Sequence, residues 1–70
     1  MMESKYEKQS IDRFIFISEG NLTQMKNNNI RTLGELSKHS ASDLKHMGID
    51  EISINQINCE LNLLGLGLNN

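Results

Sequence analysis

The loop from Gly48 to Ser53 holds the residues of this sequence that are best placed to do chemistry. Asp50 and Glu51 are two carboxylates just before Ser53, which we expect to cap a longer helix. Carboxylates beside a helix N-terminus stabilise the helix, because their negative charge is attracted to the positive end of the helix dipole. They also repel an incoming phosphate. We therefore interpret Asp50 and Glu51 first as residues of a helix start.

Three other side chains are of types that bind metals or attack substrates, but their spacing favours neither role. His39 and His46 lie on either side of an expected helix start, and Cys59 is the only cysteine of the chain. A structural zinc site needs four convergent ligands, and a nucleophilic cysteine needs a base. We expect no metal site, no cofactor and no enzymatic activity. A lone cysteine fits a reducing compartment, so we expect the protein in the cytoplasm.

Composition predicts one small globular domain. Seventy residues, 37% of them hydrophobic, allow a single modest core. The net charge of -2, with only seven Lys and Arg residues, argues against strong nonspecific nucleic-acid binding, which depends on phosphate neutralisation. The longest apolar run, Phe14–Ile17, is far too short to cross a bilayer, so we expect no membrane association.

Capping signals and hydrophobic periodicity predict an all-α bundle of four to five short helices. The segment 21–26 has the spacing of a short helix that buries Leu22 and Met25, and Asn27-Asn28-Asn29 is a turn signal. The pairs Thr32 with Glu35 and Ser40 with Asp43 have capping-box spacing. The two helices that they start are expected to bury Leu33, Leu36, Leu44 and Met47.

A longer last helix is expected to begin near Ser53. Its core stripe consists of Ile54, Ile57, Leu61 and Leu64. Gly48 and Gly65 are expected to end helices, and Leu66 and Leu68 to fold back on the core.

The start of the chain is expected to be less regular. Residues 14–17 should form an extended segment that brings both phenylalanine rings to the core. We expect residues 1–10 to be a flexible segment and residues 11–70 to be the domain.

The order of these features resembles the C-terminal domain of the bacterial RNA polymerase alpha subunit. The resemblance covers most of the chain from about Ile11, and it is carried by Ile30-Arg31-Thr32-Leu33-Gly34-Glu35-Leu36, Ser40-Ala41-Ser42-Asp43-Leu44, the loop 48–53, and Glu60 to Leu68. It implies a helix-hairpin-helix-like fold and a stand-alone, divergent copy of that domain. It also implies a role in transcription, because the family domain binds upstream promoter DNA and transcription regulators.

The residues by which that family contacts DNA are mostly replaced. The family loop holds a glycine, basic residues and a serine at a helix start, where backbone N–H groups receive a phosphate. Ser53 occupies the serine position, but Asp50 occupies the glycine position, and Glu51 and Ile52 stand where basic residues belong. The family arginine falls on Ser18 or Glu19.

Two other positions match family contacts. Asn21 and Lys26 match an asparagine and a lysine of the family, and with Gly48 and Ser53 they form the candidate DNA-binding set. The alternatives are that Asn21 is the N-cap of the first helix and that Lys26 is a solvated surface lysine.

The last helix has a second apolar face. At 100° per residue, Ile52, Cys59 and Leu63 lie together opposite the core stripe. Exposed apolar residues mark partner surfaces, so we predict a protein-binding surface made of Asp50, Glu51, Ile52 and Leu63. The alternative is that Ile52 and Leu63 pack under the N-terminal segment.

Two function classes follow. The first is a module that binds a transcription protein, which would be RNA polymerase, a sigma factor or a regulator. The alternative is a weak, salt-sensitive DNA-binding module that contacts A/T-rich promoter DNA through the loop 48–53 and the first helix. A weak homodimer is compatible with the apolar face. SAM-type interaction modules share the short capped helices, and they too are non-catalytic.

Overall fold

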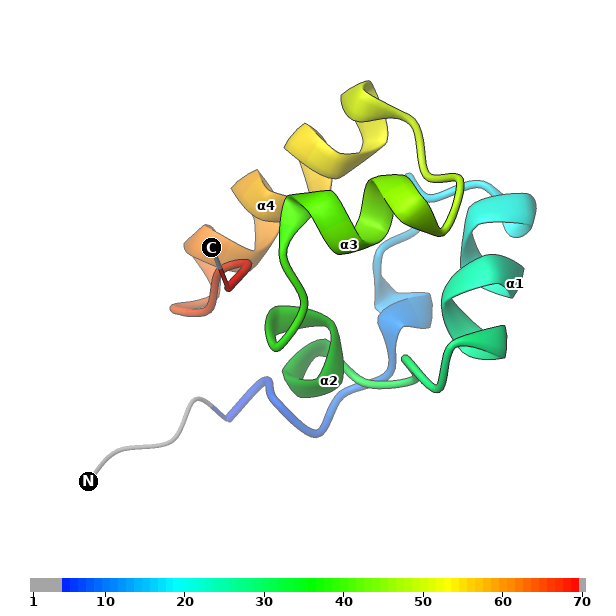
Figure 1. The fold of residues 1–70 in the computed structure, drawn as a ribbon. Helices are drawn as coiled ribbons and strands as arrows, with labels where there is room; N and C mark the ends of the chain where they lie inside the picture. Colours follow the sequence, from blue (N-terminus) through cyan, green and yellow to red (C-terminus); the bar gives the residue numbers. More distant parts are fainter. Residues whose placement is uncertain (1–4, 70) are drawn as a thin grey trace.

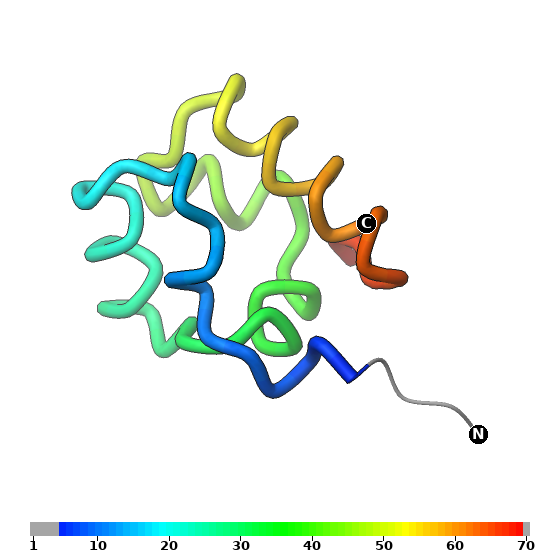
Figure 2. Tube along the Cα trace, turned by 180° about the vertical axis from the view of Figure 1, so that it is seen from behind, coloured from blue at the N-terminus to red at the C-terminus, as the bar shows by residue number. Residues whose placement is uncertain are grey.

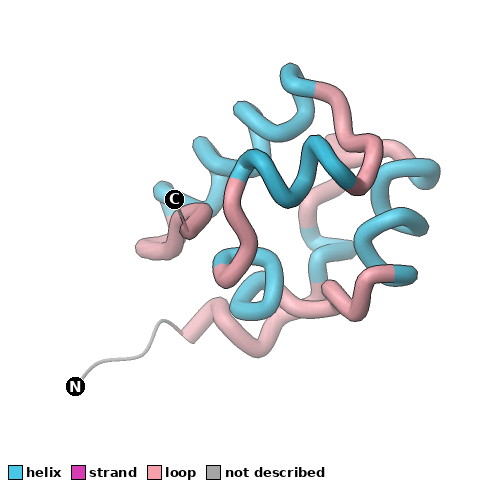
Figure 3. The backbone as a smooth tube through the Cα atoms, viewed as in Figure 1, coloured by secondary structure: helices cyan, strands magenta, loops and turns pink. Residues whose placement is uncertain are grey.

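The computed structural model describes residues 5–69 as an all-helical globule (Figure 1). A 3-10 turn, η1 (Ile11–Arg13), is followed by four helices: α1 (Glu19–Asn27), α2 (Leu33–Ser37), α3 (Ala41–His46) and α4 (Glu51–Leu63). Short loops join them, and no strand occurs among the described residues beyond one isolated bridge between Ser10 and Thr32 (Figure 3). The predicted fold class, an all-α bundle of four to five short helices, is confirmed.

Each helix begins at a side-chain oxygen that accepts a hydrogen bond from the backbone N–H three residues later. Both predicted capping boxes are present, at Thr32 with Glu35 and at Ser40 with Asp43. The other two caps correct the sequence prediction. Ser18, and not Asn21, caps α1, and Asp50, and not Ser53, caps α4. Helices α1 and α4 therefore begin three residues earlier than caps at Asn21 and Ser53 would place them.

Three of the helices end in the same hydrogen-bonded motif. The residue after each C-cap has a positive φ: Asn29 (64°), Gly48 (91°) and Gly65 (79°). The following apolar residue donates its N–H to a carbonyl in the last turn: Ile30 to Met25 (2.9 Å), Ile49 to Leu44 (3.1 Å) and Leu66 to Leu61 (2.8 Å). This is the Schellman motif, in which a hydrophobic contact accompanies the left-handed residue. The predicted helix stops at Gly48 and Gly65 and the asparagine turn are confirmed.

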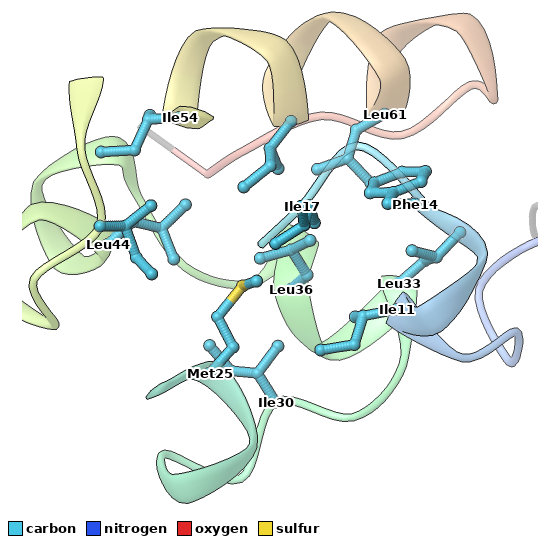
Figure 4. Close-up of a cluster of buried hydrophobic side chains, with 12 residues drawn as sticks. Ile11, Phe14, Ile17, Met25, Ile30, Leu33, Leu36, Leu44, Ile54 and Leu61 are labelled. Carbon is cyan, nitrogen blue, oxygen red and sulfur yellow. The ribbon is translucent and has the colours of Figure 1, made fainter. Parts of the chain in front are cut away.

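All four helices and the segment before α1 contribute to one apolar core (Figure 4). Met25, Leu33, Leu36 and Leu44 are fully buried in it, as predicted. The predicted stripe of α4 is buried at Ile54, Ile57 and Leu61, and Leu64 is partly buried. Leu22, Met47, Leu66 and Leu68 pack against its edge.

The segment 14–17 forms a turn, which corrects the predicted extended conformation. The N–H of Ile17 donates to the carbonyl of Phe14 at 3.1 Å, so the chain folds back within four residues. Phe14 and Ile17 therefore face the core, while Ile15 and Phe16 point outward. Of the two phenylalanine rings expected at the core, Phe14 is buried, whereas Phe16 is 36% exposed.

The chain before η1 runs along α2 on the far side of the molecule (Figure 2). Gly34 donates its N–H to the carbonyl of Glu7 at 2.8 Å, and Leu33 donates to that of Gln9 at 2.9 Å. Tyr6 packs against the core. Packing thus begins before Ile11, where the sequence places the domain boundary. The first four residues of the predicted flexible segment lie outside the described part of the chain.

Candidate functional site

The N-termini of α1 and α4 lie side by side, and three side chains join them. Asn21, in the first turn of α1, donates from Nδ2 to Asp50 Oδ1 at 3.2 Å and to Ser53 Oγ at 3.3 Å. Two members of the candidate DNA-binding set, Asn21 and Ser53, are thus brought together with Asp50. Their hydrogen-bonding groups face one another within the fold.

The carboxylate of Asp50 accepts three of the four hydrogen bonds of this cluster. Ser53 donates its backbone N–H to Oδ2 at 3.0 Å and its hydroxyl to Oδ1 at 2.8 Å. The Ser53 hydroxyl, the Ser53 N–H and the Asn21 amide hold the pKa of Asp50 below its ordinary value of 3.8. The start of α4 therefore carries an anion that belongs to the protein itself, at the kind of position where helices bind phosphate.

The other two members of the DNA-binding set lie apart from this cluster. Lys26 Nζ forms an ion pair with Asp12, at 3.0 Å from Oδ1, and this bond lowers the pKa of Asp12. Gly48 lies in the turn between α3 and α4, where its positive φ ends α3, and a Cβ there would meet no atom within 4 Å.

The predicted protein-binding residues lie along the solvent-facing side of α4. Asp50 is the N-cap of α4 and Glu51 is its first residue. The interpretation of these two carboxylates as residues of a helix start is confirmed. Ile52 is 73% exposed and Leu63 is 75% exposed, and Cys59 is also exposed between them. The alternative that Ile52 and Leu63 pack under the N-terminal segment is wrong.

Two residues of the turn 14–17 extend this surface. Ile15 is 93% exposed and Phe16 is 36% exposed. Phe16 stacks on Phe14 at a centroid distance of 5.3 Å and, with Gln56, Cys59 and Glu60, lines a hollow of about 290 Å³. Ile15 lines a second hollow of about 200 Å³ whose wall includes Leu63. We call Ile15, Phe16, Ile52, Cys59 and Leu63 the outer strip.

The two histidines lie beside an open groove between α1 and α3 of about 490 Å³. His39 Nδ1 is 3.7 Å from Asp43 Oδ2, and that carboxylate already accepts the backbone N–H of Ser40. Within residues 5–69, no three His, Cys, Asp or Glu side chains converge to hold a metal. None of the helices in this part of the chain is long and apolar enough to cross a membrane.

Sequence reasoning missed the bond between α1 and α4 and the contribution of the turn 14–17 to the outer strip. The spacings Ser18-x-x-Asn21 and Asp50-x-x-Ser53 are the local signals that could have identified both caps. The contact between Asn21 and Asp50 has no local signal, because 29 positions separate the two residues.

Comparison with protein families, with curated proteins and with solved structures gives no match for this chain.

Proposed function

We propose that this protein is a small non-catalytic module that binds a transcription protein through the outer strip. The partner class comes from the resemblance to the polymerase alpha C-terminal domain and comprises RNA polymerase, a sigma factor or a regulator. The observation that carries the proposal is the exposure of Ile52 and Leu63 at the two ends of α4. Large apolar side chains that line one exposed helix face are typical of a docking surface.

Three of the candidate DNA-binding residues already form hydrogen bonds within the protein, which supports a protein partner over DNA. Asn21 and Ser53 donate to Asp50, and Lys26 donates to Asp12. A phosphate at the start of α4 would meet the carboxylates of Asp50 and Glu51, and repulsion between like charges opposes binding there.

A binding experiment with purified bacterial RNA polymerase tests the proposal. We would titrate isotope-labelled protein with core polymerase, and separately with its sigma factor, and follow the amide signals by NMR. Broadening should be greatest at Ile52, Cys59 and Leu63. The variant Ile52→Lys with Leu63→Glu should abolish it, whereas Asn55→Lys with Asn62→Glu makes the same charge changes at exposed positions on another face of α4 and should not. Equal binding by both variants would refute the role of the strip.

A titration with an A/T-rich duplex at low salt tests the alternative. We expect no shifts at millimolar DNA. Shifts confined to Asn21, Lys26 and the loop 48–53 that fade as salt rises would overturn the proposal and establish DNA binding.

A further inference from the structure

Residues 5–10 form a strap across the start of α2 (Figure 2). The N–H groups of Leu33 and Gly34 lie in the first turn of α2, where no carbonyl of the helix itself can accept them. The carbonyls of Gln9 and Glu7 accept them instead, at 2.9 Å and 2.8 Å. The strap thus completes the hydrogen bonding of a helix that is only five residues long.

Gly34 makes this close approach possible. A Cβ at this position would lie 2.9 Å from the carbonyl oxygen of Glu7, so a larger residue would push the strap away from the helix. Glycine weakens a helix relative to alanine, and Gly34 does not have the positive φ that would require a glycine. The contact with the strap therefore accounts for the glycine.

The strap is held by little buried surface. None of residues 5–10 is buried, and only Tyr6 and Glu7 are half-buried. Arg13 fastens the strap from η1, because its guanidinium lies 5.0 Å from the centroid of the Tyr6 ring and donates to Gln9 Oε1. Contacts of this kind at exposed positions contribute little each.

We propose that the strap opens and closes while the rest of the domain stays folded, and that Arg13 couples its state to the outer strip. Ile11 is the first fully buried residue of the described chain, so opening as far as Ser10 exposes no buried core side chain. Segments with few buried apolar contacts open at a lower free energy than the whole domain.

Arg13 is shared by the strap and one end of the outer strip. It lines the hollow of about 200 Å³ together with Ile15 and Leu63, and Glu60 is the carboxylate among the lining residues. The closed strap holds the guanidinium. When the strap opens, the guanidinium becomes free to pair with Glu60 and to cover the apolar wall of the hollow. This regulation of partner binding rests on the proposed function, whereas the opening of the strap does not.

Native-state hydrogen exchange of the full chain tests the opening. The amides of Leu33 and Gly34 should exchange with little dependence on denaturant, whereas that of Ile57 should exchange only on global unfolding. Glu35 is the control for unfolding of α2, because its N–H lies in the same turn but donates to Thr32 Oγ1. A denaturant dependence at Gly34 equal to that at Ile57 would overturn the inference. Exchange of Glu35 together with Gly34 would also overturn it, since α2 itself would then be unfolding.

Two substitutions and a matched control test what fastens the strap. Tyr6→Ala should raise the exchange rate of the Gly34 amide about tenfold, because the half-buried ring is lost. Arg13→Gln should raise it about threefold. Arg31→Gln removes the same charge at another exposed position and should leave the rate unchanged. Equal rates in Arg13→Gln and Arg31→Gln would refute the role of Arg13.

Methyl NMR spectra and polymerase binding test the coupling. Tyr6→Ala should shift the methyl signals of Ile15 and Leu63 but not those of Ile52, at the other end of α4. The same change in the Arg13→Gln background should shift none of them, and equal shifts in both backgrounds would refute the coupling through Arg13.

Tyr6→Ala should also weaken binding to polymerase several-fold. Unchanged binding by this variant, where the parent binds, would overturn the regulation. Failure of the parent itself to bind would refute the proposed function and leave the opening of the strap to stand on hydrogen exchange.

Discussion

Two exposed glycines of this fold differ in backbone conformation, and that difference predicts opposite effects of the same substitution. A Cβ at Gly20 or at Gly48 would meet no atom within 4 Å, so neither change to alanine causes a clash. Gly48 has a φ of +91°, whereas Gly20 lies in the first turn of α1. The left-handed region costs an L-residue about 1–2 kcal/mol. Loss of freedom in the unfolded chain offsets about 0.4–1 kcal/mol of that cost.

Gly48→Ala should therefore destabilise the fold by about 1 kcal/mol, which for a domain of this size lowers Tm by about 4–8 °C. Gly20→Ala should raise Tm by about 2–4 °C, because alanine is the better helix former. Gly48→Asn should recover part of the loss, since asparagine already adopts a positive φ at Asn29.

Thermal unfolding followed by far-ultraviolet circular dichroism measures all three variants. If Gly48→Ala were as stable as the parent, or if Gly48→Asn were no better than Gly48→Ala, the left-handed residue would not be what ends α3.

Two further predictions concern the start of the chain and the helix caps. In Gly34→Ala, the new Cβ would lie 2.9 Å from the carbonyl oxygen of Glu7, so the change should separate residues 5–10 from α2 and lower the free energy of unfolding by roughly 1–3 kcal/mol. The amide of residue 34 should then lose its protection from hydrogen exchange, and unchanged protection would contradict the prediction. The pKa values of Asp12, Glu35, Asp43 and Asp50 all lie below their ordinary values, because the folded state hydrogen-bonds the ionised forms. Their stabilisation is full above about pH 5 and is lost as the pH falls through the lowered pKa values, so Tm should decrease steadily below about pH 4; a Tm independent of pH in that range would show that the caps do not depend on ionisation.

The features that the sequence predicts correctly are those with local causes. Both capping boxes, the positive-φ stops and the core stripe of α4 depend on residues within one or two helical turns of each other. Each signal therefore has the same meaning in the isolated segment and in the folded chain.

The errors arise where two residues that are both good N-caps compete for the same helix start, or where the cause lies far away in the sequence. Asp50 and Ser53 are both good N-caps, and the burial of Ile49 after α3 leaves Asp50 as the first residue free to start α4. The choice between Ser18 and Asn21 has the same form. The outward position of Phe16 depends on a turn that packs against α4, and hydrophobicity alone does not predict it.

The caps at both ends of α4 also control the length of the helix, and length determines which residues share its solvent-facing side. Asp50 fixes the first turn, and Gly65 with Leu66 fixes the last. One residue inserted between them would preserve both ends but rotate Leu63 by about 100° relative to Ile52. The same insertion would also shift the buried residues Ile54, Ile57 and Leu61 relative to the rest of the core, because they lie between the same two caps. The length of α4 therefore couples the outer strip to the core, and a change of length should disturb the exposed face and the fold together.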